Sequence, residues 1–415
     1  MSEPARISTT APALRGPRAL RARRVLRALA TAAAVALAGC QVAPVQPPVA
    51  PPIAPHAIYA PSTFDALPGW HDDDVAAAWP AFLESCRALS ARGTTIDAWR
   101  DVCTRANAIR MDDKAAIRAF LEVSLAPWRI TSSDGSDTGR VTGYYEPLIA
   151  GSLTRAAPYT TPIYAPPDDL LTVDLASLYP ELTGKRVRGR LDGKRVVPYW
   201  TRADIDAGRA DTRGRALAWV ADPVDAFFLQ IQGSGRIRLD DGTMLRVGYA
   251  DQNGQPYRSI ARVLIDRGEM TADQASMQSI RAWGRAHADE LPALLEANPS
   301  YVFFRLVPPP APGSLDAMID GPIGSLGVPL LAGRTVAVDR RSIPLGTPVW
   351  LATTDPLSGE PLRRLVLAQD TGGAISGPLR IDLFWGFGDE AGAHAGAMRE
   401  DGTLWLLWPK SATPP

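Results

Sequence analysis

The sequence has few of the residues that commonly bind metals. Among its 415 residues there are only 3 cysteines and 4 histidines, and no Cys/His cluster occurs. Zinc sites are typically built around Cys and His ligands at short spacing, so we expect no metal site. The sequence also lacks a Walker loop, a dinucleotide-binding fingerprint and a Ser/His/Asp set, and it therefore implies no cofactor.

An excess of charge of one sign is also missing, since 44 basic residues balance 44 acidic ones. The balance hides an asymmetry, because residues 1–39 contain seven arginines and a single acid, Glu3. The rest of the chain therefore has 37 basic and 43 acidic residues, a net charge of −6. Nucleic-acid-binding domains present basic patches, so we expect no nucleic-acid partner.

Long hydrophobic runs are absent as well, and the apolar run at residues 29–37 is too short to span a bilayer. It follows an arginine-rich stretch and leads into Leu-Ala-Gly-Cys40, which resembles a bacterial lipobox. Residues 1–40 are therefore predicted to be a lipoprotein signal peptide that ends at a lipidated Cys40. The alternative is an ordinary cleaved signal with a chance cysteine. Gln41 resembles the residue after the cysteine in lipoproteins sent to the outer membrane, so we expect a lipid-anchored protein on its periplasmic face.

The other two cysteines, Cys86 and Cys103, form an even pair if Cys40 carries lipid. In an oxidising compartment such a pair can form a disulfide. Two buried free thiols are the alternative, and the sequence does not decide between them.

The proline-rich residues 41–64 are predicted to be an extended tether of polyproline type. A helical pattern follows up to about residue 128, and β patterns with Asp-Gly turns extend to about residue 247. Helical patterns return at 259–298, and apolar β runs occupy 301–407. The expected fold class is mainly β with helices, an α+β protein.

Three aspartates punctuate the last β region: Asp339, Asp370 and Asp382. Asp339 precedes two arginines and Asp370 precedes Thr-Gly-Gly, so each of them could instead cap a turn. Asp382 interrupts an apolar strand and has no turn to serve. Burial there would raise its pKa, as a general acid working near neutral pH requires.

Several motifs carry a resemblance to a known family. They are Ala-Val-Asp339-Arg-Arg, Asp370-Thr-Gly-Gly, Ile-Asp382-Leu-Phe-Trp-Gly and, upstream, Thr142-Gly-Tyr-Tyr-Glu-Pro and Gln230-Ile-Gln-Gly-Ser-Gly. Together they resemble the membrane-bound lytic murein transglycosylase A family. The resemblance implies a double-psi β-barrel built from residues 65–147 and 309–410. It also implies a second β-rich domain inserted at 148–308, with a substrate groove between the two.

The resemblance further implies cleavage of the β-1,4 bond between N-acetylmuramic acid and N-acetylglucosamine in peptidoglycan, with a 1,6-anhydromuramyl end formed. Ordinary glycosidases need two carboxylates, but here the substrate's own 6-hydroxyl attacks and one carboxyl suffices. Asp382 matches the family's acid/base position, and Asp370 and Asp339 are expected to support it.

Candidate sugar contacts are Tyr145, Glu146 and the turn formed by Gln232, Gly233, Ser234 and Gly235. Their structural alternative is an inter-domain hinge and a tight hairpin. Trp385 and Phe387 could stack on sugar rings, although core positions are favoured for both.

Two other functions compete with this one. A non-catalytic glycan-binding lipoprotein could use the same groove, and an inverting glycosidase could use Glu146 as a second carboxylate. In each case the expected partners are peptidoglycan glycan strands and, through the anchor, the outer membrane. Cell-wall synthases and amidases are further candidate partners.

Overall fold

The computed structural model describes residues 55–91, 97–182 and 187–415. The predicted signal peptide, Cys40 and residues 41–54 of the predicted tether lie outside the described residues. Within the described ranges, no helix has the length and apolar character needed to cross a membrane.

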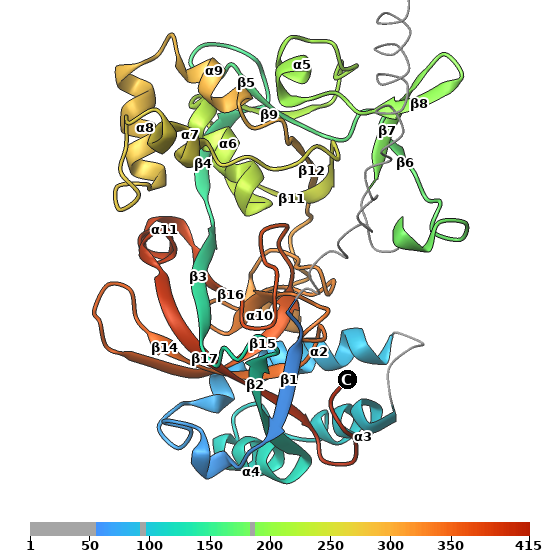
Figure 1. The fold of residues 1–415 in the computed structure, drawn as a ribbon, viewed down its shortest axis with the longest axis vertical. Coiled ribbons are helices and arrows are strands. Elements are labelled where there is room, and N and C mark those ends of the chain that lie inside the picture. The colour runs from blue at the N-terminus through green and yellow to red at the C-terminus, as the bar shows by residue number, and fades with distance from the viewer. Residues whose placement is uncertain (1–54, 92–96, 183–186) are drawn as a thin grey trace, which may run out of the picture. The chain divides into compact units, whose positions relative to one another are not determined.

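The N-terminal part of the described chain is mainly helical (Figure 1). Its elements are β1 (Ala57–Pro61), η2 (Phe64–Ala66), η3 (Val75–Ala78), α2 (Trp79–Ser90), α3 (Asp97–Ala106) and α4 (Lys114–Ser124). The structure links α2 to α3 through a disulfide between Cys86 and Cys103, whose Cα atoms are 5.1 Å apart. Of the two alternatives left open by the sequence, the structure thus contains the disulfide.

The largest sheet contains β1 and strands from both ends of the chain. Those strands are β2 (Leu125–Ser132), β3 (Gly139–Glu146), β13 (Thr335–Val338), β14 (Pro348–Thr354), β15 (Pro361–Asp370), β16 (Ile381–Phe387) and β17 (Arg399–Pro409). Their order is β1-β2-β17-β14-β15-β13-β16-β3, and β17 also pairs with β3. The strands from β17 round to β3 therefore close into a barrel, which leaves them no open edge. The double-psi topology of this barrel stays a prediction.

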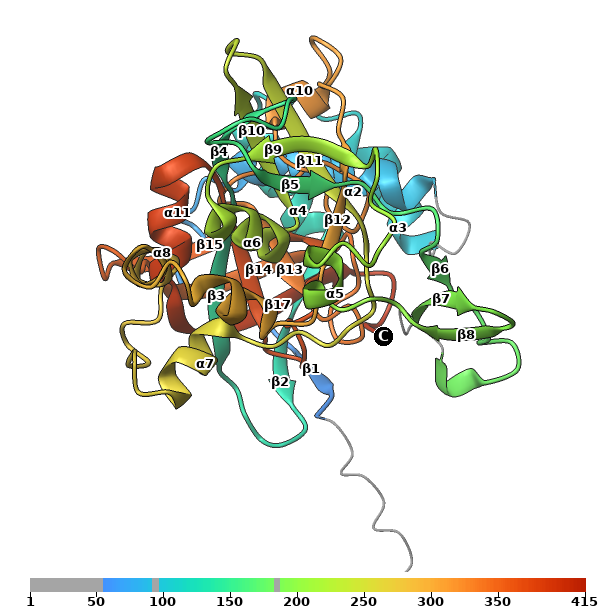
Figure 2. The same cartoon turned by 90° about the horizontal axis from the view of Figure 1, so that it is seen from above.

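A second sheet has the order β12-β11-β10-β4-β9-β5. Its strands are β4 (Leu148–Ser152), β5 (Thr161–Tyr164), β9 (Ala216–Val220), β10 (Ser234–Leu239), β11 (Met244–Gln252) and β12 (Val302–Leu306). A three-stranded sheet of β6 (Leu171–Thr172), β7 (Arg188–Asp192) and β8 (Arg195–Pro198) stands to one side of it in Figures 1 and 2.

The remaining helices lie in and after the region of the second sheet, and η4 falls between β6 and β7 of the three-stranded sheet. They are η4 (Pro180–Leu182), α5 (Arg202–Asp206), α6 (Pro223–Gln232), α7 (Ile260–Asp266), α8 (Met277–Ala286), α9 (Leu291–Glu296), α10 (Leu315–Ile319) and α11 (Gly388–Ala397). Helices α6, α7, α8 and α9 share a core of their own, and α11 packs on β3 and β16 of the barrel. The expected α+β fold class with a predominance of strands is confirmed.

The predicted tether is wrong at its C-terminal end. Strand β1 lies inside the predicted range and pairs antiparallel with β2, from Ala57 opposite Ser132 to Pro61 opposite Trp128. The Tyr59 hydroxyl donates a hydrogen bond to the carbonyl of Ser342. Proline is compatible with an edge strand, so the prolines around this segment did not exclude it from the sheet.

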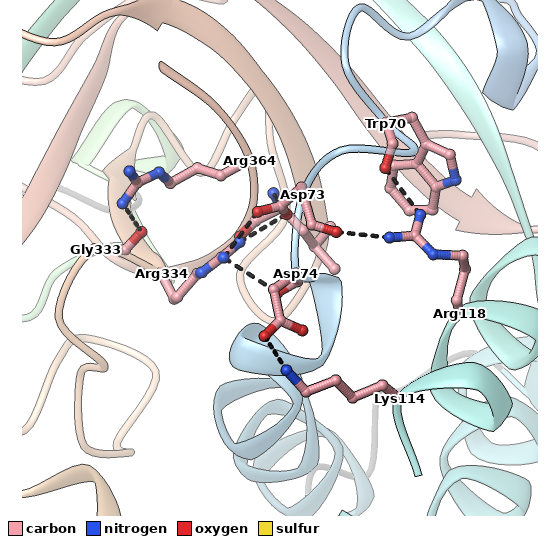
Figure 3. Close-up of polar contacts among 9 residues, drawn as sticks. Trp70, Asp73, Asp74, Lys114, Arg118, Gly333, Arg334 and Arg364 are labelled. Carbon is pink, nitrogen blue, oxygen red and sulfur yellow. Dashed lines mark hydrogen bonds and ion pairs between the residues drawn. The ribbon is translucent and has the colours of Figure 1, made fainter. Parts of the chain in front are cut away.

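A buried ion pair fixes the N-terminal segment to the barrel (Figure 3). Both terminal guanidinium nitrogens of Arg334 contact the carboxylate of Asp73, at 2.7 and 2.8 Å. The same carboxylate accepts a hydrogen bond from the backbone N–H of Leu365 at 3.0 Å. The side chains of Asp73 and Arg334 are only 6% and 12% exposed. Arg118 of α4 donates to the backbone carbonyls of Trp70 and Asp73, so α4 is held to the same point.

We expect the substitution Asp73→Asn to lower the free energy of unfolding by about 3 kcal/mol, because it leaves the buried Arg334 without its counter-charge. Chemical denaturation of the purified protein measures the change. The control is Lys114→Gln, which removes the pair that Lys114 forms with Asp74 at 2.5 Å on the surface. That pair is largely exposed, so its loss should cost less than about 1 kcal/mol. Equal losses for the two variants would contradict the role given to Asp73.

Candidate active site

The register of four barrel strands places two carboxylates in one row. Ala337 of β13 is paired with Asp370 of β15 on one side and with Asp382 of β16 on the other. Asp382 is in turn paired with Thr142 of β3. Residues paired across neighbouring strands point to the same face, and strands lie about 4.8 Å apart. The two aspartates therefore flank β13 on one face, with the small side chain of Ala337 between them.

A β-bulge produces this alignment. Val336 is paired with Ala368, but the next residue, Ala337, is paired with Asp370, so Gln369 is an extra residue in β15. The Gln369 side chain is fully buried and donates to the Ala81 carbonyl at 2.7 Å and to the Ser85 hydroxyl at 2.9 Å. Bulges change the direction in which the following side chain points. Here the bulge directs Gln369 toward helix α2 and Asp370 toward the row that contains Asp382.

Asp382 is half-buried and has a sparse set of hydrogen-bond partners. The hydroxyl of Thr142 donates to its Oδ1 atom at 2.6 Å. Burial raises the pKa of Asp382 to about 6, and the nearby Asp370 acts in the same direction. The hydrogen bond from Thr142 and the positive charge of Arg380 oppose that rise. Asp382 can thus exist in both protonation states near neutral pH.

Asp370 is surrounded by donors. Its Oδ1 atom accepts from the backbone N–H and the hydroxyl of Ser325, at 2.9 and 2.8 Å, and from the N–H of Thr371 at 2.9 Å. Its Oδ2 atom accepts from the hydroxyl of Tyr144 at 3.0 Å. Burial raises the pKa of Asp370 overall, and these hydrogen bonds oppose the rise because they favour the carboxylate. The two neighbouring carboxyls therefore have contrasting surroundings, which is how proteins assign different roles to acid pairs.

Asp339 lies just beyond β13 and is bound to other groups. Arg341 contacts both of its carboxylate oxygens through its side chain, at 3.0 and 2.6 Å, and Gly377 donates its N–H at 2.9 Å. The hydrogen bonds from Arg341, assisted by Gly377, lower the pKa of Asp339 to about 2 despite its burial. Asp339 thus connects its own turn to the glycine-rich loop between Asp370 and Asp382, and it remains ionised.

Two residues next to the aspartates were not among the predicted site residues. Thr142 and Tyr144 belong to the Thr-Gly-Tyr-Tyr-Glu-Pro motif, and they contact Asp382 and Asp370 respectively. They alternate along β3, so both point to the face that carries the row of aspartates. The two-residue period of a strand was the signal that could have identified them, once the motif was recognised as a strand.

Tyr145 points to the opposite face of β3, away from the row. Gly392 of α11 lies against its ring, and its hydroxyl lies 3.5 Å from the sulfur of Met277. Tyr145 lines a cavity of about 400 Å³ between β3, α6, α8 and α11, and none of the three aspartates lines that cavity. Helices α8 and α11 lie close together in Figures 1 and 2. A sugar contact by Tyr145 would therefore be separate from the aspartate site.

Gln232 and the glycines near it have structural contacts. The side-chain carbonyl of Gln232 accepts a hydrogen bond from the N–H of Tyr145 at 3.1 Å, which joins α6 to β3. Gly233 ends α6 in the left-handed region, with φ at 78°, and Ser234 begins β10. A Cβ atom on Gly235 would lie 2.3 Å from a methyl group of Leu229. The segment is a helix end followed by a strand, whereas a tight hairpin was the structural alternative in the sequence.

Glu146 is the clearest correction among the predicted sugar contacts. It is 1% exposed, and its carboxylate pairs with the side chain of Arg236 at 2.8 Å. Arg236 also contacts Asp320, at 3.1 Å. Protein atoms cover this carboxyl in the structure, and its pair with Arg236 joins β3 of the barrel to β10 of the second sheet. Glu146 is also unsuited to act as the second carboxylate of an inverting glycosidase.

The two aromatic residues after Asp382 differ in their surroundings. Trp385 stacks on His394, with ring centroids 4.4 Å apart, and its ring N–H faces the sulfur of Met398. Phe387 is 40% exposed, and the guanidinium of Arg236 lies over its ring. The preference for a core position thus fits Trp385 better than Phe387. Among the residues that the structure describes, no cluster of three or more His, Cys, Asp or Glu side chains could hold a metal ion.

Comparison with known proteins agrees with this description. Residues 140–305 match the family described as the MltA specific insert domain, and residues 334–408 match the 3D domain. The membrane-bound lytic murein transglycosylase A of Escherichia coli K12 is 36% identical over 298 residues, which are 70% of this chain and 71% of that protein.

Solved structures are similar too. MltA from Neisseria gonorrhoeae, in its monoclinic form, is 38% identical with a TM-score of 0.74, covering 86% of this chain and 94% of that one. The Escherichia coli MltA structure with bound chitohexaose is 30% identical with a TM-score of 0.60, and the match covers 88% of this chain and 94% of that one.

With this fold and this site, the named relatives identify a lytic transglycosylase, the class of lyases that cleave peptidoglycan. The chain belongs to the membrane-bound lytic murein transglycosylase A family, as its motifs predicted.

The environment of Asp339 leads to a prediction about stability and pH. We expect Asp339→Asn to reduce the free energy of unfolding at pH 7 by about 1–2 kcal/mol, because the charge-assisted hydrogen bonds weaken while the partner Arg341 stays solvated. A carboxyl whose folded-state pKa is depressed stabilises the protein above its unfolded pKa of about 4. That contribution is lost as the pH falls from about 4 to about 2. Urea denaturation at several pH values should therefore show the two proteins converging at low pH, and a constant difference would contradict this explanation.

Proposed function

We propose that this protein cleaves the β-1,4 bond between N-acetylmuramic acid and N-acetylglucosamine in peptidoglycan and leaves a 1,6-anhydromuramyl end. One observation carries the proposal. Asp382 is half-buried with a pKa of about 6 and one hydroxyl donor. A single strand, β13, separates it from Asp370, whose carboxyl has four donors. A carboxyl such as that of Asp382 can give up a proton and take one back near neutral pH.

In the first step, protonated Asp382 donates its proton to the glycosidic oxygen as the bond from that oxygen to C1 breaks. Positive charge develops on C1 and the ring oxygen of the muramyl residue. The nearby carboxylate of Asp370 stabilises this charge by electrostatic attraction. The same negative charge raises the pKa of Asp382 and so helps it to stay protonated before the reaction.

In the second step, the 6-hydroxyl of the muramyl residue attacks C1 and Asp382, now a carboxylate, accepts the hydroxyl proton. The new C1–O6 bond closes the anhydro ring, and Asp382 ends in its starting state. Water is not consumed, so no second carboxylate is needed to activate it. The burial of Glu146 in its pair with Arg236 supports a single-carboxyl mechanism over an inverting hydrolase.

The two sheets correspond in this proposal to two domains, the barrel from 65–147 and 309–410 and the insert at 148–308, with the glycan strand between them. The chitohexaose bound to the Escherichia coli relative is a glycan and supports a glycan ligand here. The glycine-rich loop after Asp370 is mostly exposed at Gly372, Gly373 and Ala374, and small residues leave room for a sugar chain to approach.

The expected location follows from the N-terminus. A lipid on Cys40 would hold the protein on the periplasmic face of the outer membrane, with the peptidoglycan within reach of the tether. The relatives are named membrane-bound, which supports an anchor. Cell-wall synthases and amidases remain candidate partners.

The substitution Asp382→Asn tests the proposal. Asparagine keeps the shape but has no acidic proton to donate, so we expect the release of soluble muropeptides from purified sacculi to fall by about 10²–10⁴-fold. The matched control is Asp240→Asn, an exposed position between β10 and β11, which should leave the release unchanged. Circular dichroism and the melting temperature establish that both variants are folded.

Wild-type release by a folded Asp382→Asn protein would overturn the assignment. If the wild-type protein binds sacculi but releases nothing from them, the protein is a glycan-binding lipoprotein instead.

A further inference from the structure

A hydrogen-bonded chain leads from the protein surface to Asp382. Arg380, two residues earlier, donates from Nη2 to the hydroxyl oxygen of Thr142 at 2.8 Å. That hydroxyl lies 2.6 Å from Oδ1 of Asp382. The other terminal nitrogen of Arg380 donates to the carbonyls of Ile381 and Arg140, at 2.8 and 3.2 Å. The guanidinium is thus fixed to both β16 and β3, beside the threonine.

The direction of each hydrogen bond in this series follows from the number of hydrogens that each group can donate. A guanidinium can only donate, so the oxygen of Thr142 must be the acceptor in its contact with Arg380. A threonine hydroxyl has a single hydrogen, and that hydrogen then points to Asp382. Oδ1 of Asp382 is consequently an acceptor, and it is the less favourable place for a proton of its own.

We infer that Thr142 and Arg380 are positioning residues that keep the dissociable proton of Asp382 on Oδ2, the oxygen that faces away from the threonine hydroxyl. Neither residue needs to touch the substrate for this role. Without Arg380, the hydroxyl of Thr142 could rotate and accept a hydrogen bond from a protonated Oδ1. The proton would then have two places on the carboxyl, and only one of them would serve the glycosidic oxygen. That last point depends on the proposed function, whereas the placement of the proton does not.

The charges around Asp382 favour its protonated form, and the hydrogen-bonded chain from Arg380 through Thr142 opposes them. Burial and the carboxylate of Asp370, from β15, both favour the protonated form of Asp382. On this face of β3, Tyr144 remains neutral because burial raises its pKa well above its usual value. Arg140 shares the face, and its side chain donates to the backbone carbonyl of Arg399. Arg399 of β17 is paired with Thr142 and donates to the carbonyls of Ala272 and Ala275. Strand β13 contributes the uncharged Ala337. Thr142 and Arg380 are therefore the groups that favour the carboxylate.

Helix α11 also packs on β3 and β16 and carries charged groups. It lies over Gly143 and Tyr145, which occupy the opposite face of β3 from Thr142. Its titratable residues are Asp389, Glu390 and His394. His394 stacks on Trp385 and pairs with Asp355. These groups are separated from Asp382 by the strand itself.

The test compares Thr142→Val, which keeps the shape but removes the hydroxyl, with Thr142→Ser, which keeps the hydroxyl. The carboxyl of Asp382 is titrated by NMR in full-length protein labelled with ¹³C at the aspartate carboxyl carbon, and the spectrum of Asp382→Asn identifies its signal. Loss of a hydrogen bond to a charged group should raise the midpoint for Thr142→Val by about one pH unit. The serine variant should titrate like the wild type.

The rate of muropeptide release measured against pH supplies the second readout. Asp382 must be protonated to act first as an acid, so the rate should fall as the pH rises through its pKa. In Thr142→Val this descending limb should move up with the NMR midpoint, while the maximal rate falls about tenfold because the proton is no longer confined to Oδ2. A valine that merely disturbed packing would lower the rate without moving the limb.

Arg380→Met tests whether the arginine acts through the threonine. We expect it to raise the midpoint as well, and the shift in the double variant with Thr142→Val should be smaller than the two single shifts added together. An unchanged or lowered midpoint in Thr142→Val, or an equal shift in Thr142→Ser, would overturn the inference. If the NMR midpoints shift as expected but the activity profiles do not change, the hydrogen-bonded series is supported and Asp382 is not the acid of the proposed reaction.

Discussion

Burying a carboxylate is costly unless hydrogen bonds or opposite charges compensate for it, and the barrel meets this constraint differently for each of its three aspartates. Asp339 is compensated by Arg341 and Gly377, and Asp370 by four donors. Asp382 has a single hydroxyl donor and the charge of Arg380. Its compensation is incomplete, so the proton can reside on Asp382. The proposed chemistry depends on this difference between side chains that are chemically identical.

The fold supplies the difference through strand register. A one-residue bulge at Gln369 places Asp370 level with Ala337 and hence with Asp382. Without the bulge, Gln369 would occupy that position in the row. Gln369 itself is tied to α2, which is joined to α3 by the disulfide and held near the barrel wall where Asp73 pairs with Arg334. The helical segment before the barrel thus supports the strand that places Asp370.

Much of this could be predicted from the sequence, for identifiable reasons. Asp382 stood out because it is a charged residue inside an apolar strand, where there is no turn for it to cap. The motifs, found in the expected order, identified the family. The roles of Glu146 and Gln232 could not be predicted, because their partners Arg236 and Tyr145 are 90 and 87 residues away in the chain. Strand β1 was missed because its flanking prolines suggested a tether, while its pairing with β2 depends on residues about 70 positions later. The bulge at Gln369 leaves no mark in the local pattern, although it decides where Asp370 points.

The central claim is that one carboxyl suffices because the substrate supplies its own nucleophile. Digestion of purified sacculi in water enriched in ¹⁸O, followed by mass spectrometry of the muropeptides, tests it most directly. The account predicts 1,6-anhydromuramyl ends without ¹⁸O. Reducing muramic acid ends that carry one ¹⁸O atom would show that water attacks C1, and would contradict it.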